Sequence, residues 1–228
     1  MKLFLALIGV TSAYGAVPAA LCAASAWLSF EAYDLLFGHA CAVGLIVSLF
    51  SHEAGHIIAA RIVGVRASLP YFLPMLGAVI CLKRRVRDAR YEAAIALGGP
   101  ALGSLSACLF LALYLWSGER MYLLWSYLAA WLNLFNLIPC YPLDGGRIGS
   151  AVSRYAWCVG MVLMVICLWV WKQILFLLLI IGALYRCYRG EQVQAICLSW
   201  RLWILGCYLL LCILLGGLTM MIELLLNR

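Results

Sequence analysis

Charged residues are scarce in this chain of 228 residues, at 11% of the composition, and only nine residues are acidic. The sequence is instead 67% hydrophobic, with a mean hydropathy of +1.05. Soluble domains carry about 25% charged residues and far fewer apolar ones, which excludes an ordinary soluble protein. The composition therefore predicts an all-α polytopic membrane protein.

Long polar segments are also missing, and apolar runs of about 20 residues, the length that crosses a bilayer as a helix, follow one another along the chain. We predict six to seven transmembrane helices, because only Lys172 and Gln173 separate two short runs. Those two runs form a tight hairpin, or one of them crosses incompletely. The predicted spans are residues 3–30, 39–64, 92–117, 121–140, 153–171, 173–189 and 202–226.

The first run begins after Lys2, as a signal peptide does, but it continues without a polar cleavage region. We therefore expect residues 1–30 to be retained as a helix. Glu31 and Asp34 follow this helix and are predicted to lie in an external loop.

Negative charge is outnumbered, and the net charge is +7. All basic residues except Arg120, Lys172 and Arg228 fall on one predicted side of the membrane, many of them in the loop over residues 65–91. The positive-inside rule places that side, with the N-terminus, in the cytoplasm. The asymmetry indicates membrane topology, or a surface for anionic lipids or substrate, and not nucleic-acid binding.

No C-x-x-C pair occurs among the eleven cysteines, which predicts buried reduced thiols and not a cysteine zinc site. Histidine is rarer still, with three residues, and two of them flank Glu53 in the sequence His52-Glu53-Ala54-Gly55-His56. Imidazoles four residues apart share one face of a helix and can bind one metal ion. Glu53 is placed to take a proton from a water molecule that such an ion activates. Ionisable groups at membrane depth are costly and usually functional.

A third metal ligand is needed, because catalytic zinc usually takes three protein ligands and keeps one open position. His39 precedes His52 by 13 residues, about 20 Å along a helix, which is too far. Asp144 is the single acid in a segment that two prolines and two glycines keep from forming regular helix. Its predicted membrane depth equals that of the histidines. Asp144 is therefore the candidate third ligand.

The apolar loop over residues 69–82 is too short and too rich in proline to cross a membrane as a helix. Ala78 to Leu82 favours a strand and Gly77 permits a turn, which predicts a β-hairpin or re-entrant loop at the membrane. An open strand edge can pair with an extended peptide.

A Gly-Gly-Pro sequence in the next span indicates close helix packing, or a helix loosened near a site. The candidate substrate-binding residues are Gly77, Ala78, Val79, Ile80, Gly99 and Pro100.

Three motifs in this order resemble the site-2 protease family of intramembrane zinc metalloproteases. They are the H-E-A-G-H sequence, the Gly98-Gly99-Pro100 span, and Asn136 to Gly146, which matches N-L-x-P-x-x-P-L-D-G-G. The resemblance covers about residues 40–155. It implies that these residues form the catalytic core of one membrane-embedded domain over residues 1–228, without PDZ or CBS domains.

The resemblance also implies roles for the motif residues. One Zn²⁺ per chain would be held by His52, His56 and Asp144, and Glu53 would act as general base and then as proton donor to the leaving amine. Asn136 would polarise the substrate or steady the oxyanion, although a packing hydrogen bond is the alternative for this residue.

The implied activity is hydrolysis of a peptide bond in or near a transmembrane segment of a membrane protein. We expect a multi-pass protein of a prokaryotic plasma membrane, with the site toward the cytoplasm and with a transmembrane protein substrate and lipids as partners. A zinc transporter is one alternative, but such transporters usually extend the motif with another acid, where this chain has Ile57 and Ile58. A homologue that binds membrane helices without cutting them is the other. The substrate, any prior cut and the oligomeric state are left open by the sequence.

Overall fold

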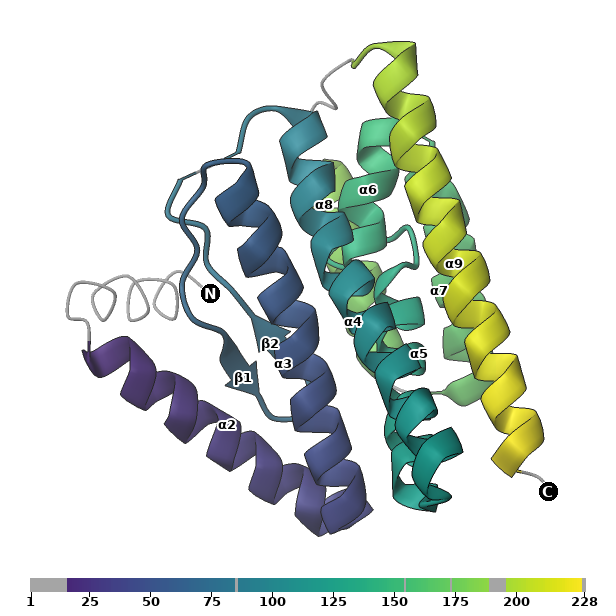
Figure 1. Ribbon diagram of the computed structural model, residues 1–228. Coiled ribbons are helices and arrows are strands. Elements are labelled where there is room, and N and C mark those ends of the chain that lie inside the picture. Colours follow the sequence, from purple (N-terminus) through teal and green to yellow (C-terminus); the bar gives the residue numbers. More distant parts are fainter. Residues whose placement is uncertain (1–15, 85, 154, 173, 189–195, 227–228) are drawn as a thin grey trace.

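The computed structural model describes residues 16–84, 86–153, 155–172, 174–188 and 196–226, and this part is chiefly helical (Figure 1). The only sheet in the described residues is a two-stranded antiparallel hairpin. Both features confirm the predicted class of a helical protein with a short hairpin. The helices are α2 (Ala16–Phe37), α3 (His39–Ile62), α4 (Ala89–Ser117), α5 (Arg120–Asn136), α6 (Asp144–Val152), α7 (Ala156–Trp171), α8 (Ile174–Tyr188) and α9 (Leu198–Leu226), and the strands are β1 (Tyr71–Leu73) and β2 (Gly77–Val79).

Three helices among the described residues, α3, α4 and α9, are long and apolar enough to cross a membrane. Their 24, 29 and 29 residues exceed the roughly 20 residues that a bilayer core requires. Helices α7 and α8 are apolar but shorter. The total of six to seven spans therefore stays a prediction.

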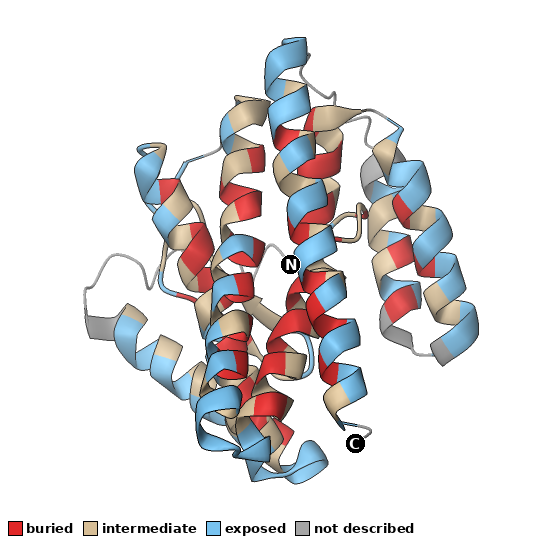
Figure 2. Cartoon of the chain, turned by 45° about the vertical axis from the view of Figure 1, so that its right-hand side comes forward, coloured by how far each residue is buried: buried red, intermediate tan, exposed pale blue. Residues whose placement is uncertain are grey.

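The outer faces of the helices are exposed (Figure 2), and many of the exposed residues are large and apolar. Trp169 is 79% exposed and Ile213 is 72% exposed. Several polar side chains, by contrast, lie in the interior. This distribution suits a hydrocarbon surround, because exposed apolar surface of such extent is rare on soluble monomers.

Helices α3 and α4 pack closely at small residues, which allows their backbones to approach. A side chain at Gly55 of α3 would overlap the carbonyl group of Gly98 in α4, and Gly98 itself faces the Ala59 methyl group. Helix α4 begins at Ala89, earlier than the predicted residue 92, because Asp88 caps it by accepting a hydrogen bond from the Arg90 N–H (2.9 Å). The side-chain hydrogen bond from Arg90 also lowers the pKa of the Asp88 carboxyl group.

The hairpin lies between α2 and α3 (Figure 1). Tyr71 pairs with Val79 and Leu73 with Gly77, and the Phe72 N–H donates to the Ser25 hydroxyl of α2 (3.1 Å). The predicted strand over residues 78–82 was wrong in extent, since β2 ends at Val79 and Ile80 lies outside it. The ladder is interrupted because the Cys81 N–H donates to the Ser68 side chain (2.9 Å), and pairing resumes only as a single bridge at Leu82.

Two other boundaries differ from the prediction. Helix α2 continues to Phe37 and so contains Glu31 and Asp34, which were expected in a loop. No glycine or proline stops the helix between residues 30 and 37, and Gly38 follows its end. The first fifteen residues, and with them residues 3–15 of the predicted span 3–30, lie outside the described part of the chain.

The segment around Asp144 is more regular than expected. Helix α5 ends at Asn136, before Pro139 and not at residue 140, and α6 then begins at Asp144 itself. The helix forms despite three glycines because its buried face, which includes Ile148 and Ala151, joins the main apolar core. In membrane proteins as in soluble ones, such packing outweighs the intrinsic cost of glycine in a helix. Asp144 thereby gains a fixed position at a helix N-terminus.

We predict that Gly55→Ala lowers the midpoint of thermal unfolding in detergent, because the added methyl group would force α3 and α4 apart. Overpacking of this kind typically costs about 1–3 kcal/mol. Gly206→Ala in α9 is the matched control, since a Cβ there meets no atom within 4 Å. Equal melting temperatures for the two variants would contradict the close α3–α4 contact.

Candidate metal centre

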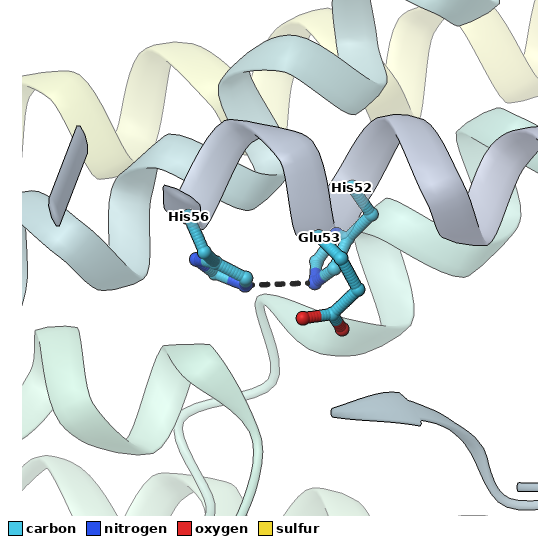
Figure 3. Close-up of side chains that lie close together, drawn as sticks. All are labelled: His52, Glu53 and His56. Atoms are coloured by element: carbon cyan, nitrogen blue, oxygen red, sulfur yellow. Dashed lines mark hydrogen bonds between the residues drawn. The ribbon is translucent and has the colours of Figure 1, made fainter. Parts of the chain in front are cut away.

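His52, Glu53 and His56 lie on consecutive turns of α3 and are all buried in the interior. One nitrogen from each imidazole and one carboxylate oxygen of Glu53 lie within 4.8 Å of one another, close enough to hold a metal ion. Figure 3 shows the two imidazoles pointing toward each other, with the Glu53 carboxylate beside them. The spacing-based prediction of one shared helix face is confirmed.

Asp144 completes the cluster from the other side. Its Oδ2 atom lies 3.1 Å from Nε2 of His52 and 3.1 Å from Nε2 of His56, and the two Nε2 atoms are 3.0 Å apart. Glu53 forms no ion pair with either imidazole within the described part of the chain. The structure thus brings together the three predicted ligand side chains, although 88 residues separate His56 from Asp144 (144 − 56).

Hydrogen bonds at the far side of each ring decide which imidazole nitrogen faces the cluster as an acceptor. The His56 Nδ1–H donates to the Ile95 carbonyl oxygen (2.7 Å), which can only accept. The His52 Nδ1–H donates to Oδ1 of Asn133 (2.8 Å). In the neutral rings both Nε2 atoms are therefore left with a lone pair directed at each other and at the Asp144 carboxylate.

Three electron-rich atoms at such distances repel one another unless a proton or a cation lies between them. Zinc ligands about 2.1 Å from a shared ion are about 3.4 Å apart in a tetrahedral arrangement, close to the 3.0 and 3.1 Å found here. Two nitrogens and a carboxylate oxygen form a donor set that zinc accepts. A divalent ion would also balance the charges of Asp144 and Glu53, two buried carboxylates. The residues present fit a metal ion.

Arg147 supports the outer oxygen of the Asp144 carboxylate. Its Nη1 lies 4.0 Å from Oδ1 of Asp144, one helical turn away on α6, while Oδ2 faces the histidines. The Arg147 side chain is 36% exposed, so solvent screens this long ion pair and it contributes little to the stability of the fold.

The predicted substrate-binding residues fall into two groups. Gly99 touches the cluster itself, because its N–H lies 3.3 Å from Nδ1 of His56 and a side chain there would overlap the His56 ring. Pro100 follows it inside α4 and is buried. The Gly-Gly-Pro sequence does not interrupt α4, which continues through it as regular helix.

The hairpin residues lie farther along α3. Gly77 faces the Leu49 side chain, and Ala78 packs in the same apolar cluster as Leu49. Leu49 and Glu53 are four residues apart on one helix, so their side chains are neighbours on its surface. The hairpin is thereby placed on the side of α3 from which Glu53 projects, with Val79 and Ile80 next along the chain.

Asn136 was predicted to stabilise the oxyanion. Its side-chain amide forms a hydrogen bond within α5, where Nδ2 donates to the Leu132 carbonyl oxygen (3.0 Å). Asn133, one turn earlier, is the residue that contacts an imidazole, and the sequence reasoning missed it. The available signal was a second asparagine three residues away, on nearly the same helix face as Asn136. Which of the two asparagines contacts His52 depends on the rotation of α5 about its axis. That rotation is set by helix packing and cannot be predicted from a local motif.

Comparisons with known proteins agree with this geometry. Residues 40–121 match the model of the Peptidase family M50. The putative zinc metalloprotease Rip3 of Mycobacterium tuberculosis is 35% identical over 130 residues, which cover 54% of this chain and 32% of that protein. A zinc metalloprotease of Methanocaldococcus jannaschii is 31% identical over 113 residues, 47% of this chain and 32% of the relative. The matches thus span about a third of the length of these relatives.

A solved structure, described as a site-2 protease from Methanocaldococcus jannaschii, is also similar. It is 22% identical, with a TM-score of 0.49, over 75% of this chain and 88% of the other. That likeness is too low to place individual residues or to support a function. The family model and the curated relatives confirm the resemblance that the motifs indicate: residues 40–121 match Peptidase family M50, and the relatives are described as zinc metalloproteases.

Proposed function

We propose that this protein is an intramembrane zinc metalloprotease that hydrolyses a peptide bond in or near a transmembrane segment of another protein. One observation carries the proposal: two imidazole nitrogens and the Asp144 carboxylate converge beside Glu53 on a helix long and apolar enough to span a membrane. The similarity to proteins described as zinc metalloproteases supports the same chemistry.

His52, His56 and Asp144 would hold one zinc ion. When bound, zinc supplies a Lewis acid that polarises the scissile carbonyl and makes a water molecule acidic near neutral pH. Of the two nearby carboxylates, Asp144 is the better ligand because Oδ2 already contacts both Nε2 atoms. Glu53, which forms no such contact among the described residues, is left free to exchange protons.

Glu53 would accept the proton of the attacking water and then donate it to the nitrogen of the leaving amine. Its burial keeps bulk water from competing for that proton. Asn136 would donate to the developing oxyanion, since an amide nitrogen carries two hydrogens and Leu132 takes one of them. Gly99 would serve the site by letting α4 approach the His56 ring, and Pro100, buried next to it in α4, is proposed as a substrate-binding residue on the strength of its motif.

The hairpin would present the substrate. A helical substrate conceals its peptide bonds in internal hydrogen bonds and must unwind before cleavage. In the described residues β2 pairs only with β1, which leaves its other edge without a strand partner, and an unwound substrate segment would pair there. Gly77, Ala78, Val79 and Ile80 are the residues that we propose to hold the unwound segment beside Glu53.

The remaining parts of the proposal concern placement. The basic loop after α3 and the uneven charge favour a multi-pass protein with its N-terminus and its metal centre toward the cytoplasm, in a prokaryotic plasma membrane. Residues 1–228 would act as one membrane-embedded domain with its core at about residues 40–155. Its partners would be the transmembrane protein substrate and the surrounding lipids.

We expect Glu53→Gln to keep bound zinc and to lose at least about 100-fold in cleavage rate, because loss of general acid–base catalysis typically costs that much or more. Zinc is measured by elemental analysis of purified protein, and cleavage with a model transmembrane substrate in proteoliposomes. His52→Ala is the comparison that should lose both. Undiminished cleavage by Glu53→Gln would falsify the proposed function.

A photo-reactive amino acid placed at Val79 should cross-link to the substrate in the Glu53→Gln background, because the open edge of β2 would lie against the unwound segment. Trp169, on the exposed outer face of α7, is the control position and should give only background cross-linking. Equal yields at both positions would argue against substrate pairing at β2.

A further inference from the structure

We propose that Asn133 is a positioning residue that holds the His52 imidazole in the tautomer and orientation that metal binding requires. The proposal rests on the proposed metal centre and extends it to a residue outside the motifs. Asn133 lies on α5, is fully buried, and accepts a hydrogen bond from His52 through Oδ1 at 2.8 Å.

The direction of this hydrogen bond is fixed by the other end of the amide. Nδ2 of Asn133 donates to the Ala129 carbonyl oxygen at 2.7 Å, and that oxygen can only accept. Exchanging the amide oxygen and nitrogen would place two acceptors against each other at Ala129. Oδ1 must therefore face His52, and Nδ1 of His52 must carry the hydrogen. The Nε2 lone pair is then directed at Asp144 and His56.

The side chain has no room to turn elsewhere. Gly103 of α4 lies directly against the Asn133 amide, so closely that a Cβ at Gly103 would overlap all three of its terminal heavy atoms. The amide thus packs against the backbone of α4 on one side and is hydrogen-bonded to the Ala129 carbonyl oxygen on the other. Because the Asn133 side chain is already ordered, it loses little conformational entropy when the metal ion binds.

The two histidines differ in how their tautomers are set. His56 donates to a main-chain carbonyl, that of Ile95, which no side-chain substitution removes. His52 depends on the side chain of Asn133. Partners of metal-binding histidines typically change metal affinity about 10–100-fold when they are removed. Asn133 is accordingly the point at which a substitution can weaken the site without touching a ligand.

The test compares zinc affinity, measured by competition with a chromophoric chelator, in the full-length protein in detergent. Asn133→Leu keeps the approximate volume but removes the acceptor, and we expect zinc affinity to fall about 10–100-fold. Asn133→Asp restores an acceptor toward His52, although its second oxygen then meets the Ala129 carbonyl oxygen, and it should bind zinc more tightly than Asn133→Leu. Ser126→Ala is the matched control, because Ser126 is also buried on α5 and donates to α4, at the Ala107 carbonyl oxygen (2.8 Å).

Wild-type affinity in Asn133→Leu would overturn the positioning role, as would an equal loss in Asn133→Leu and Ser126→Ala. His52→Ala separates this outcome from failure of the proposed metal centre: if His52→Ala also binds zinc as tightly as wild type, zinc does not occupy this site at all.

A second measurement needs no variant of Asn133. The protein contains three histidines, which can be labelled with ¹⁵N. NMR spectra that correlate the ring nitrogens with the carbon-bound ring protons then show which nitrogen of each imidazole is protonated. We expect His52 to carry its hydrogen on Nδ1 in the zinc-loaded protein. A hydrogen on Nε2 of His52, or zinc coordinated through Nδ1, would overturn the proposal. The signal is assigned by its loss in His52→Ala.

Discussion

The mutual approach of three electron-rich atoms, Nε2 of His52, Nε2 of His56 and Oδ2 of Asp144, is the constraint on which the rest of the centre depends. Acceptors do not gather in a buried site without a cation or proton, because the low local dielectric strengthens their repulsion. Each neighbouring helix contributes to holding them. Helix α3 supplies both imidazoles, α4 a carbonyl group, α5 an amide, and α6 the carboxylate at its first residue.

In a membrane, the ionised side chains of this centre are costly in free energy unless the protein shields them from the hydrocarbon. An ionised side chain at the centre of a bilayer costs about 2.5–3.5 kcal/mol on insertion scales. Here Glu53 and Asp144 are buried inside the protein, while many large apolar residues are exposed on its outside. Small residues where α3 meets α4 allow the backbones to approach and bring Gly99 into contact with the imidazoles. Close packing and metal chemistry are therefore coupled at the same pair of helices.

Local sequence was sufficient for the features that depend on spacing along one helix. The shared face of His52 and His56 follows from the helical repeat, and Asp144 was identified because few other acids were available at that depth. Features set by contacts between distant segments were not predictable. The start of α6 at Asp144 depends on packing of its apolar face, the end of β2 on a hydrogen bond to Ser68, and the role of Asn133 on the rotation of α5.

The most direct test of the centre is X-ray absorption spectroscopy at the zinc edge of the purified protein. Binding by His52, His56 and Asp144 predicts nitrogen and oxygen neighbours at about 2.0–2.2 Å, with imidazole scattering and no sulfur. Loss of one oxygen neighbour in Asp144→Ala, with both imidazoles retained, would agree with that ligand set. A sulfur neighbour at about 2.3 Å, or zinc surroundings unchanged in Asp144→Ala, would contradict it.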